Sequence, residues 1–271
     1  MGCFRVAVIT LLTDFGSDDP YVGCMKGVIL SINPNARIID ITHGVPKHNI
    51  YIAGFILRTA YRYFPKDSIH VVVVDPGVGG SRKPIIIKSK NYYFIGPDNG
   101  VLTLAASDDG IESVYEINLK SKYFAGKEIS YTFHGRDIFA PAAAYLSLGV
   151  DPSELGIKSN ITKAIEFEES RIDKSGRIRS KVVYVDSFGN IVLNVPARYI
   201  RDGLMEFGRY YNVYVSNKVV KARLSRSYEE VGIGEPLLIP DSFNLIELAI
   251  NKGSASSKFK VSVGDEIIIE L

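Results

Sequence analysis

Val71-Val-Val-Val-Asp75-Pro-Gly-Val-Gly-Gly-Ser-Arg82 joins an apolar, β-branched run to a carboxylate, a glycine-rich turn and a guanidinium. Such runs are typical of buried strands, and ligands of open α/β sheets bind where the strands end. Because glycine has no Cβ, the turn can approach a ligand closely or adopt a positive φ. We therefore expect a strand over 70–74 that brings Asp75 and Arg82 to one polar site. The alternative is an ordinary turn with a surface ion pair.

The first half of the chain alternates between strand-like and helix-like patterns. Buried strands are expected over 4–12, 37–41 and 70–74, and apolar residues at helical spacing predict helices over 21–32 and 50–64. This order is typical of βαβ units, so we expect a mostly parallel sheet. Strands over 84–89 and 92–95 are expected to be antiparallel at the margin of the sheet. A helix over 136–148 is expected to end at Gly149.

The pattern changes after residue 150. Residues 151–180 are rich in Glu, Lys, Arg and Ser and have little periodicity, which is typical of a connector. Short apolar runs separated by Gly, Asp and Ser then predict a small β-barrel or sandwich; they lie at 182–185, 191–193, 211–215, 236–239, 245–250 and 266–271. We expect an α/β domain over 1–158 with a mostly parallel sheet, a connector over 159–178 and a smaller barrel-like all-β domain over 179–271.

Composition excludes several classes of protein. The chain has 271 residues, of which 46% are hydrophobic and 23% charged, and its net charge of +2 comes from interspersed residues. A nucleic-acid-binding surface would need clustered Lys and Arg, and the longest apolar runs are too short to span a bilayer. The N-terminus has no secretory signal pattern. Cys3 and Cys24 have no CxxC spacing, so we expect no disulfide framework, no metal site and a cytoplasmic protein.

Two further motifs carry polar groups in the first domain. Thr13-Asp14-Phe-Gly16 follows the first strand, where a carboxylate can accept two hydrogen bonds from a ribose diol, although the GxGxxG pattern is absent. Asp18 or Asp19 is expected to cap the next helix. Phe133-His134-Gly135-Arg136-Asp137 opens the last helix of the domain. A lone histidine is more often structural, but His134 together with Asp75 and Arg82 would combine a base, an acid and a cation.

The remaining polar residues say less by themselves. His43, His48 and His70 lack comparable surroundings and are expected to be structural. Asp186-Ser-Phe188-Gly-Asn190 is good turn chemistry, and a turn is the favoured interpretation from the residues alone. The alternative is that the Asn190 amide reads a base edge beside a stacking Phe188 ring. Ser242 and Glu247 are uninformative alone.

Taken together, the motifs TDFG, DPGVGGSR, FHGRD, DSFGN and DSFNLIELAINKGSAS, in this order, resemble the S-adenosyl-L-methionine (SAM) hydroxide adenosyltransferases. These adenosine-forming SAM hydrolases are related to fluorinase and chlorinase. The resemblance extends over nearly the whole chain and implies an α/β domain followed by a β-barrel domain. It also implies a homotrimer, with SAM held between the N-terminal domain of one subunit and the C-terminal domain of its neighbour. SAM would be the substrate, adenosine and L-methionine the products, and no cofactor would be needed.

The resemblance also implies roles for individual residues. Asp75, Arg82 and His134 match the catalytic set, with Asp75 also against the substrate, and Asp14 matches the carboxylate that holds the ribose hydroxyls. The other matched positions would contact adenine or methionine: Asn190, Phe188 and the backbone at Ile250 lie along adenine, and Asp186, Ser242 and Glu247 face the methionine amino and carboxylate groups.

Departures from the halogenating relatives favour the branch that uses water. Those enzymes carry tyrosines where this chain has Asp75 and His134, and fluorinase has a halide-contacting serine where this chain has Gly135. Fluorinase also carries an inserted loop that is missing between Lys88 and Gly96. A carboxylate at 75 would repel a halide ion.

The resemblance therefore implies in-line attack of water on C5′ of SAM, with Arg82 keeping Asp75 ionised and either Asp75 or His134 as general base. The alternatives are a SAM-dependent halogenase, a SAM or adenosine sensor without turnover, and a phosphate-binding glycine loop, for which the GxxxxGK[ST] spacing is missing.

Overall fold

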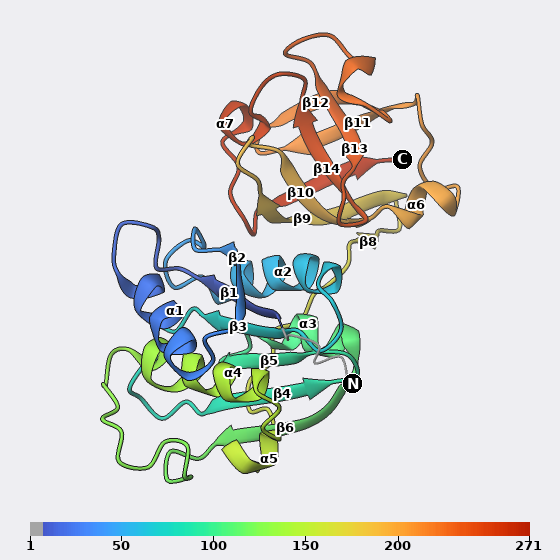
Figure 1. The fold of residues 1–271 in the computed structure, drawn as a ribbon. Coiled ribbons are helices and arrows are strands. Elements are labelled where there is room, and N and C mark those ends of the chain that lie inside the picture. The colour runs from blue at the N-terminus through green and yellow to red at the C-terminus, as the bar shows by residue number, and fades with distance from the viewer. Residues whose placement is uncertain (1–7) are drawn as a thin grey trace, which may run out of the picture. The chain divides into compact units, whose positions relative to one another are not determined.

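The computed structural model describes residues 8–271, which divide into two compact units, one ending at Glu166 and one over Phe167–Leu271. This division lies within the connector expected over 159–178. Both units are drawn in Figure 1. The start of the first expected strand, and Cys3, lie outside the described residues, whereas Cys24 is an exposed free thiol.

The N-terminal unit contains a sheet in the order β2-β1-β3-β5-β4-β6-β7. Its strands are β1 Val8–Thr13, β2 Arg37–Thr42, β3 Ile69–Val73, β4 Pro84–Ser89, β5 Tyr93–Pro97, β6 Ile111–Ile117 and β7 Gly156–Lys158. Only β4 and β7 run against the other described strands, so the expectation of a mostly parallel sheet is confirmed. The expectation for the margin is wrong in part, because β5 pairs in parallel with β3 in the middle of the sheet.

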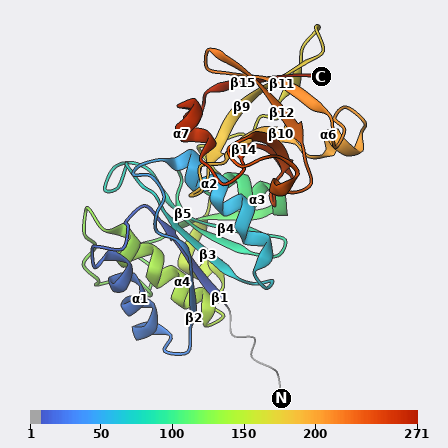
Figure 2. The same cartoon turned by 90° about the horizontal axis from the view of Figure 1, so that it is seen from above.

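Helices cover both faces of this sheet. Figures 1 and 2 show α1 (Tyr21–Ile32) and α4 (Ala140–Ser147) on one face, and α2 (Ile50–Ala60) and α3 (Thr103–Asp109) on the other. β1 and β3 are buried along their whole length, which explains why their residues are apolar without alternation. The helix expected over 50–64 ends earlier and continues as a 3₁₀ turn at Tyr61–Tyr63.

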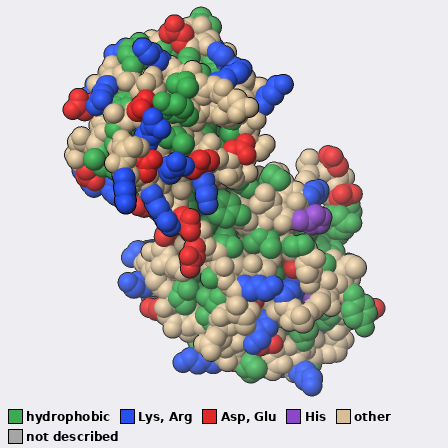
Figure 3. Space-filling view, turned by 180° about the vertical axis from the view of Figure 1, so that it is seen from behind, with side chains coloured by type: hydrophobic (Ala, Val, Ile, Leu, Met, Phe, Trp, Pro, Cys, Tyr) green, Lys and Arg blue, Asp and Glu red, His purple; other side chains and the backbone are tan. Residues whose placement is uncertain are grey.

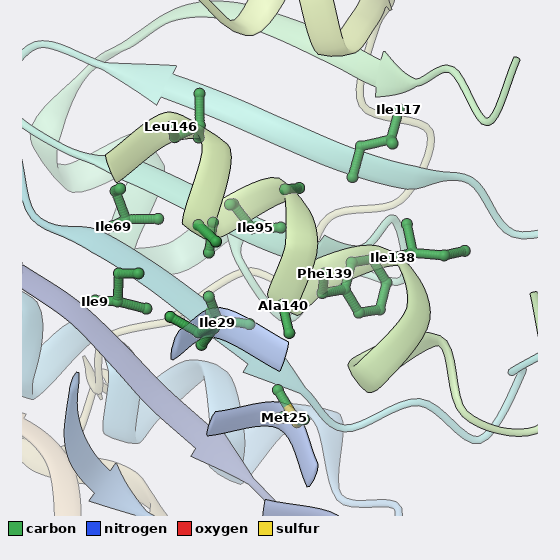
Figure 4. Packing of buried hydrophobic residues seen from close by; sticks show 14 of the residues in the cluster. Ile9, Met25, Ile29, Ile69, Ile95, Ile117, Ile138, Phe139, Ala140 and Leu146 are labelled. Atoms are coloured by element: carbon green, nitrogen blue, oxygen red, sulfur yellow. The ribbon is translucent and has the colours of Figure 1, made fainter. Parts of the chain in front are cut away.

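One hydrophobic core joins α1, α4 and the sheet. Met25 and Ile29 of α1 meet Ala140 and Leu146 of α4 over the strands, where Ile9 is one of the fully buried residues (Figure 4). α4 is preceded by a π-helical turn over Gly135–Phe139 and followed by Gly149 at φ +86°, so the expected helix end at Gly149 is confirmed.

The start of α1 differs from the expectation. Pro20 occupies the N-cap and no side chain caps the helix, so capping by Asp18 or Asp19 is wrong. Proline at the helix start already fixes φ near the helical value and brings no backbone N–H that needs a partner. The sequence pattern also missed α3, β6, β7 and the short helix α5 (Pro152–Leu155).

The C-terminal unit is a closed barrel. Seven strands pair in the cycle β10-β14-β13-β12-β11-β15-β9, and β9 returns to β10; β8 pairs with the first half of β9. The strands are β8 Arg171–Ile172, β9 Arg177–Val185, β10 Ile191–Pro196, β11 Tyr210–Val215, β12 Lys218–Leu224, β13 Pro236–Pro240, β14 Leu245–Ile250 and β15 Glu266–Glu270. Two short helices, α6 (Arg198–Arg201) and α7 (Ala255–Phe259), flank them. A barrel, rather than a sandwich, is therefore the architecture.

The surface mixes charges of both signs. On the face drawn in Figure 3, Lys and Arg side chains lie beside Asp and Glu. Exposed ion pairs such as Arg179–Glu266, 2.9 Å apart, join charges of opposite sign on the C-terminal unit. Within the part of the chain that the structure describes, no helix has both the length and the apolar character to cross a membrane.

Candidate active site

The two carboxylates singled out from the sequence follow β1 and β3, the neighbouring strands between which the strand order of the sheet reverses. The chain passes from β1 to β2 on one side and then to β3 on the other side of β1. Asp14 directly follows β1, and Asp75 lies two residues beyond β3. Ligands of open α/β sheets bind at such a switch point, outside the carboxyl ends of the strands. The topology therefore places both carboxylates where a ligand is expected.

Asp75, Arg82 and His134 are in direct contact. Nε of Arg82 donates to Oδ2 of Asp75 at 2.8 Å, Nη2 of Arg82 also donates to that oxygen, and Nη2 lies 2.7 Å from Nδ1 of His134. Side-chain exposure is 7% for Arg82 and 4% for Asp75, which rules out the surface ion pair considered above. Arg82 also packs against the Phe139 ring, 5.5 Å from its centroid. The three polar side chains form one partly buried network.

The other oxygen of Asp75 is the unusual atom of this network. Oδ1 is buried and accepts no hydrogen bond from any residue over 8–271. A buried carboxylate oxygen is normally paired, so an unpaired one indicates a place where a donor binds.

His134 is held as a neutral ring. Burial lowers its pKa below the usual value, the charge of Arg82 lowers it further, and Asp75, Asp137 and a backbone hydrogen bond at Ser130 only partly oppose this. Because arginine can only donate, Nδ1 of His134 accepts the Arg82 hydrogen bond, and the ring proton is on Nε2. Neither nitrogen then offers a free lone pair.

Asp14 is fixed by the loop that follows β2. Its Oδ2 accepts from the backbone N–H of His48 at 2.8 Å, and Nζ of Lys47 donates to its carbonyl oxygen at 2.6 Å. His48 adopts a positive φ of 64°, which orients its N–H toward the carboxylate. Among the described residues none donates to Oδ1 of Asp14, so that oxygen is open to a ligand.

A hollow of about 210 Å³ connects these groups. It is lined by Asp14, Phe15, Lys47, His48, Val73, Asp75, Val78, Thr132, Phe133, His134 and Gly135. Lys47 was not among the predicted site residues, and His48 was expected to be structural. Their position at the carboxyl end of β2, the neighbour of β1, is the signal that could have found them.

Two glycines allow close approach around this hollow. A Cβ on Gly79, whose φ is +75°, would lie 2.3 Å from the carbonyl oxygen of Tyr131, so the glycine-rich turn packs directly on the segment before His134. A Cβ on Gly135 would lie 3.2 Å from Sδ of Met25 and 3.4 Å from Val73. A larger side chain at 135 would therefore have to displace its neighbours.

In the C-terminal unit the DSFGN motif is the turn from β9 to β10. Oδ1 of Asp186 accepts from the backbone N–H groups of Phe188 and Asn190, at 2.9 and 2.8 Å, and Oδ2 accepts from Nδ2 of Asn190 at 3.0 Å. The turn expected from the residues alone is confirmed. It also leaves Phe188 77% exposed beside a buried Asn190.

A second hollow, of about 460 Å³, lies beside this turn. Its lining consists of Phe188, Asn190, Tyr228, Ile250, Lys252 and Gly253. Three of these, Asn190, Phe188 and Ile250, were expected along adenine. Tyr228, in the 3₁₀ turn Tyr228–Glu230, was missed because it is distant in sequence from the DSFGN motif.

The three residues expected to face methionine are not gathered in this hollow. Ser242 is exposed in the turn from β13 to β14, and both oxygens of Asp186 are used within its own turn. Glu247 of β14 is buried and accepts from the Tyr228 hydroxyl at 2.5 Å. Their contacts with methionine stay predictions. Over residues 8–271, no group of three or more His, Cys, Asp or Glu is arranged as a metal site would be.

Comparison with known proteins gives matches over almost the whole chain. Residues 9–156 match the family described as SAM hydroxide adenosyltransferase N-terminal domain, and residues 180–268 match its C-terminal domain. A Methanocaldococcus jannaschii protein named (R)-S-adenosyl-L-methionine hydrolase is 37% identical, over 97% of this chain and 95% of that protein. A fluorinase from Actinopolyspora mzabensis is 21% identical over 95% of each. An uncharacterized conserved protein from Thermotoga maritima has a crystal structure that matches with a TM-score of 0.91 and 40% identity, over 97% of this chain and 100% of that one.

Proposed function

The chain belongs to the SAM hydroxide adenosyltransferase family, and we propose that it hydrolyses SAM to adenosine and L-methionine. The observation that carries this proposal is the partly buried Asp75–Arg82–His134 network, in which one oxygen of Asp75, a residue that lines the hollow, is unpaired among the described residues. A water molecule is a donor that fits there, because it can give one proton to that oxygen and direct a lone pair elsewhere.

The reaction would be a single displacement at C5′ of the ribose. The water oxygen forms a bond to C5′ as the bond from C5′ to the sulfonium breaks. The electron pair of that bond goes to sulfur, which leaves as the neutral thioether of methionine. The proton of the water goes to the base and then to solvent. Removing this proton as the bond forms typically contributes about 10²- to 10⁴-fold in rate.

We assign the base to Asp75. Asp75 and His134 were both candidates from the sequence, but Nδ1 of His134 accepts from Arg82 and its other nitrogen carries the proton. Oδ1 of Asp75 is the acceptor without a partner among the described residues. Arg82 would orient the carboxylate through Oδ2, and His134 would position Arg82.

The remaining residues would hold SAM. We propose that Oδ1 of Asp14 accepts from the ribose hydroxyls, and that Phe188, Asn190 and the backbone at Ile250 contact adenine. Asp186, Ser242 and Glu247 remain candidates for the methionine end. Ser242 is the simplest of them because its side chain is exposed, whereas Asp186 and Glu247 already accept hydrogen bonds within the unit.

The assembly is part of the proposal. One unit carries the reacting groups and the other carries the adenine candidates, so each unit holds half of a site. A homotrimer in which the N-terminal unit of one subunit meets the C-terminal unit of its neighbour would complete each site. Light scattering of the purified protein would test the trimer. A cytoplasmic location and a reaction without a cofactor also belong to this proposal.

The test is a product analysis. Purified protein is incubated with each sulfonium epimer of SAM, with and without chloride or fluoride, and the products are separated by chromatography. Adenosine and methionine formed regardless of halide would support hydrolysis, and a preference for the (R) epimer would match the printed name of the Methanocaldococcus relative. A 5′-halo-5′-deoxyadenosine product would indicate a halogenase. Tight binding of SAM without product would indicate a sensor.

Halogenation is the less favoured candidate for a structural reason as well. A serine at position 135 would have its Cβ 3.2 Å from Met25 and 3.4 Å from Val73. A serine there would therefore require Met25 and Val73 to give by a few tenths of an ångström, a cost that glycine avoids.

A further inference from the structure

Four polar side chains of the barrel unit form one hydrogen-bonded chain. Nδ2 of Asn190 donates to Oδ2 of Asp186 at 3.0 Å and to the hydroxyl oxygen of Tyr228 at 3.3 Å. The Tyr228 hydroxyl in turn donates to Oε1 of Glu247 at 2.5 Å. Asn190 and Glu247 are 6% exposed each, whereas Tyr228 is 38% exposed and lines the hollow.

When the Glu247 carboxyl is ionised, counting hydrogens along this chain fixes its direction. Tyr228 has one hydroxyl hydrogen, which goes to Glu247, so its oxygen can accept from Asn190. Both amide hydrogens of Asn190 are then used. Its Oδ1 accepts from none of the described residues, and Asn190 lines the hollow, so Oδ1 is the polar atom left for a ligand.

The opposite orientation of the amide is disfavoured from two sides. Turning the Asn190 amide over would place Oδ1 against the Asp186 carboxylate and against the Tyr228 oxygen, whose hydrogen is directed to Glu247. Two acceptor–acceptor contacts would replace two hydrogen bonds.

We propose that Tyr228 and Glu247 are positioning residues that keep the Asn190 carbonyl toward the hollow, so that the site accepts a 6-aminopurine and rejects a 6-oxopurine. The amino group of adenine can donate to Oδ1. A 6-oxopurine would present a carbonyl there, and two acceptors would face each other. Sites that pair a buried polar group with a substrate reject an analogue that cannot pair. This inference rests on the proposed function, because it takes the purine of SAM as the occupant.

The test compares SAM with its 6-oxopurine analogue, S-inosylmethionine, as substrates at pH 8.5. Burial raises the pKa of Glu247 to about 7 and raises the pKa of Tyr228 well above its usual value, so at this pH the carboxylate is ionised and the tyrosine keeps its proton. We expect the wild type to prefer SAM by about 100-fold or more in kcat/KM. In Tyr228→Phe we expect this preference to fall about tenfold, through KM rather than kcat, because Asp186 still holds one amide hydrogen.

Variants at Glu247 separate positioning from general stability. Glu247→Gln keeps a carbonyl acceptor for Tyr228 and should retain the preference for SAM over S-inosylmethionine. Glu247→Leu removes that acceptor and should lower the preference as Tyr228→Phe does. Tyr214→Phe is the matched control, because Tyr214 makes a similar bond to Glu270, at 3.1 Å, elsewhere in the barrel. Its preference should equal that of the wild type.

Binding measurements keep this test independent of turnover. Adenosine and inosine are titrated calorimetrically into the full-length wild type and each variant, with circular dichroism to verify folding. If SAM is not hydrolysed but adenosine still binds more tightly than inosine in a Tyr228-dependent way, the proposed function fails and the positioning role stands. Equal binding of both nucleosides by the wild type would overturn the positioning role, as would an unchanged preference in folded Tyr228→Phe and Glu247→Leu.

Discussion

Replacing Asp75 by asparagine should separate proton transfer from substrate binding. An asparagine carbonyl can still accept from Arg82, but the amide that replaces Oδ1 cannot take a proton from water. A general base typically contributes about 10²- to 10⁴-fold, which at about 1.36 kcal/mol per factor of ten corresponds to roughly 3 to 5 kcal/mol of the barrier. We therefore expect kcat for SAM to fall by about 10²- to 10⁴-fold, and the dissociation constant of SAM to change less than about threefold.

The assay measures adenosine release by chromatography and SAM affinity by calorimetry. Asp98→Asn is the matched control: Asp98 is also a buried aspartate directly after a strand, but it accepts from Thr162 and does not line the hollow. Its kcat should stay within about threefold of the wild type. His134→Gln keeps an acceptor for Arg82, so its loss should be smaller than that of Asp75→Asn.

Either of two results would refute this assignment. If Asp75→Asn retains kcat within about tenfold of the wild type, Asp75 is not the base. If His134→Gln loses more activity than Asp75→Asn, the histidine does more than position Arg82.

Three further predictions concern other parts of the N-terminal unit. Asp14→Ala should raise KM for SAM by about 10- to 100-fold with little change in kcat, since hydrogen bonds to a charged group contribute about 1.5 to 3 kcal/mol; equal losses in kcat would contradict a binding role. Gly79→Ala should lower the free energy of unfolding in urea by about 1 to 3 kcal/mol more than Gly126→Ala. Both glycines have a positive φ, but of the two only Gly79 would bring an added Cβ to 2.3 Å from a backbone oxygen, that of Tyr131. Equal losses would mean that this contact relaxes. Burial lowers the pKa of His70 to about 3, so between pH 6.5 and 3 protons bind the unfolded chain preferentially, and the free energy of unfolding should fall by up to about 1.4 kcal/mol per pH unit on acidification. Urea titrations at pH 7 and 5 should show a smaller drop in His70→Asn; the same drop would assign acid sensitivity to other groups.

The elements with uniform patterns were the predictable ones. The helix Tyr21–Ile32 and the strands Pro84–Ser89 and Leu245–Ile250 have the bounds that the pattern indicated, because each is a continuous run limited by turn residues. α3 was missed because Thr103–Asp109 is short and built of small residues. β12 was missed because Lys218–Leu224 is exposed mainly in its first half and rich in cations.

The candidate site was predictable only where its residues lie in local motifs. Asp14, Asp75 and His134 follow strand ends or open a helix, which a single sequence displays. His48 and Tyr228 reach the two hollows through backbone geometry and through a partner distant in the chain. No local rule encodes such a contact, because it depends on the register and closure of sheets.

Because of the π-helical turn at Gly135–Phe139, the position of His134 depends on the number of residues in that turn. Such a turn holds one residue more than the α-helical turn it replaces. Removing any one of its residues would restore the α-helix, yet would rotate everything before it by about 100° about the helix axis. His134 stands directly before the turn, so its ring would leave Arg82 while the helix Ala140–Ser147 could keep its place in the core. A scan of substitutions would never reveal this dependence, because it is the number of residues that aims the histidine.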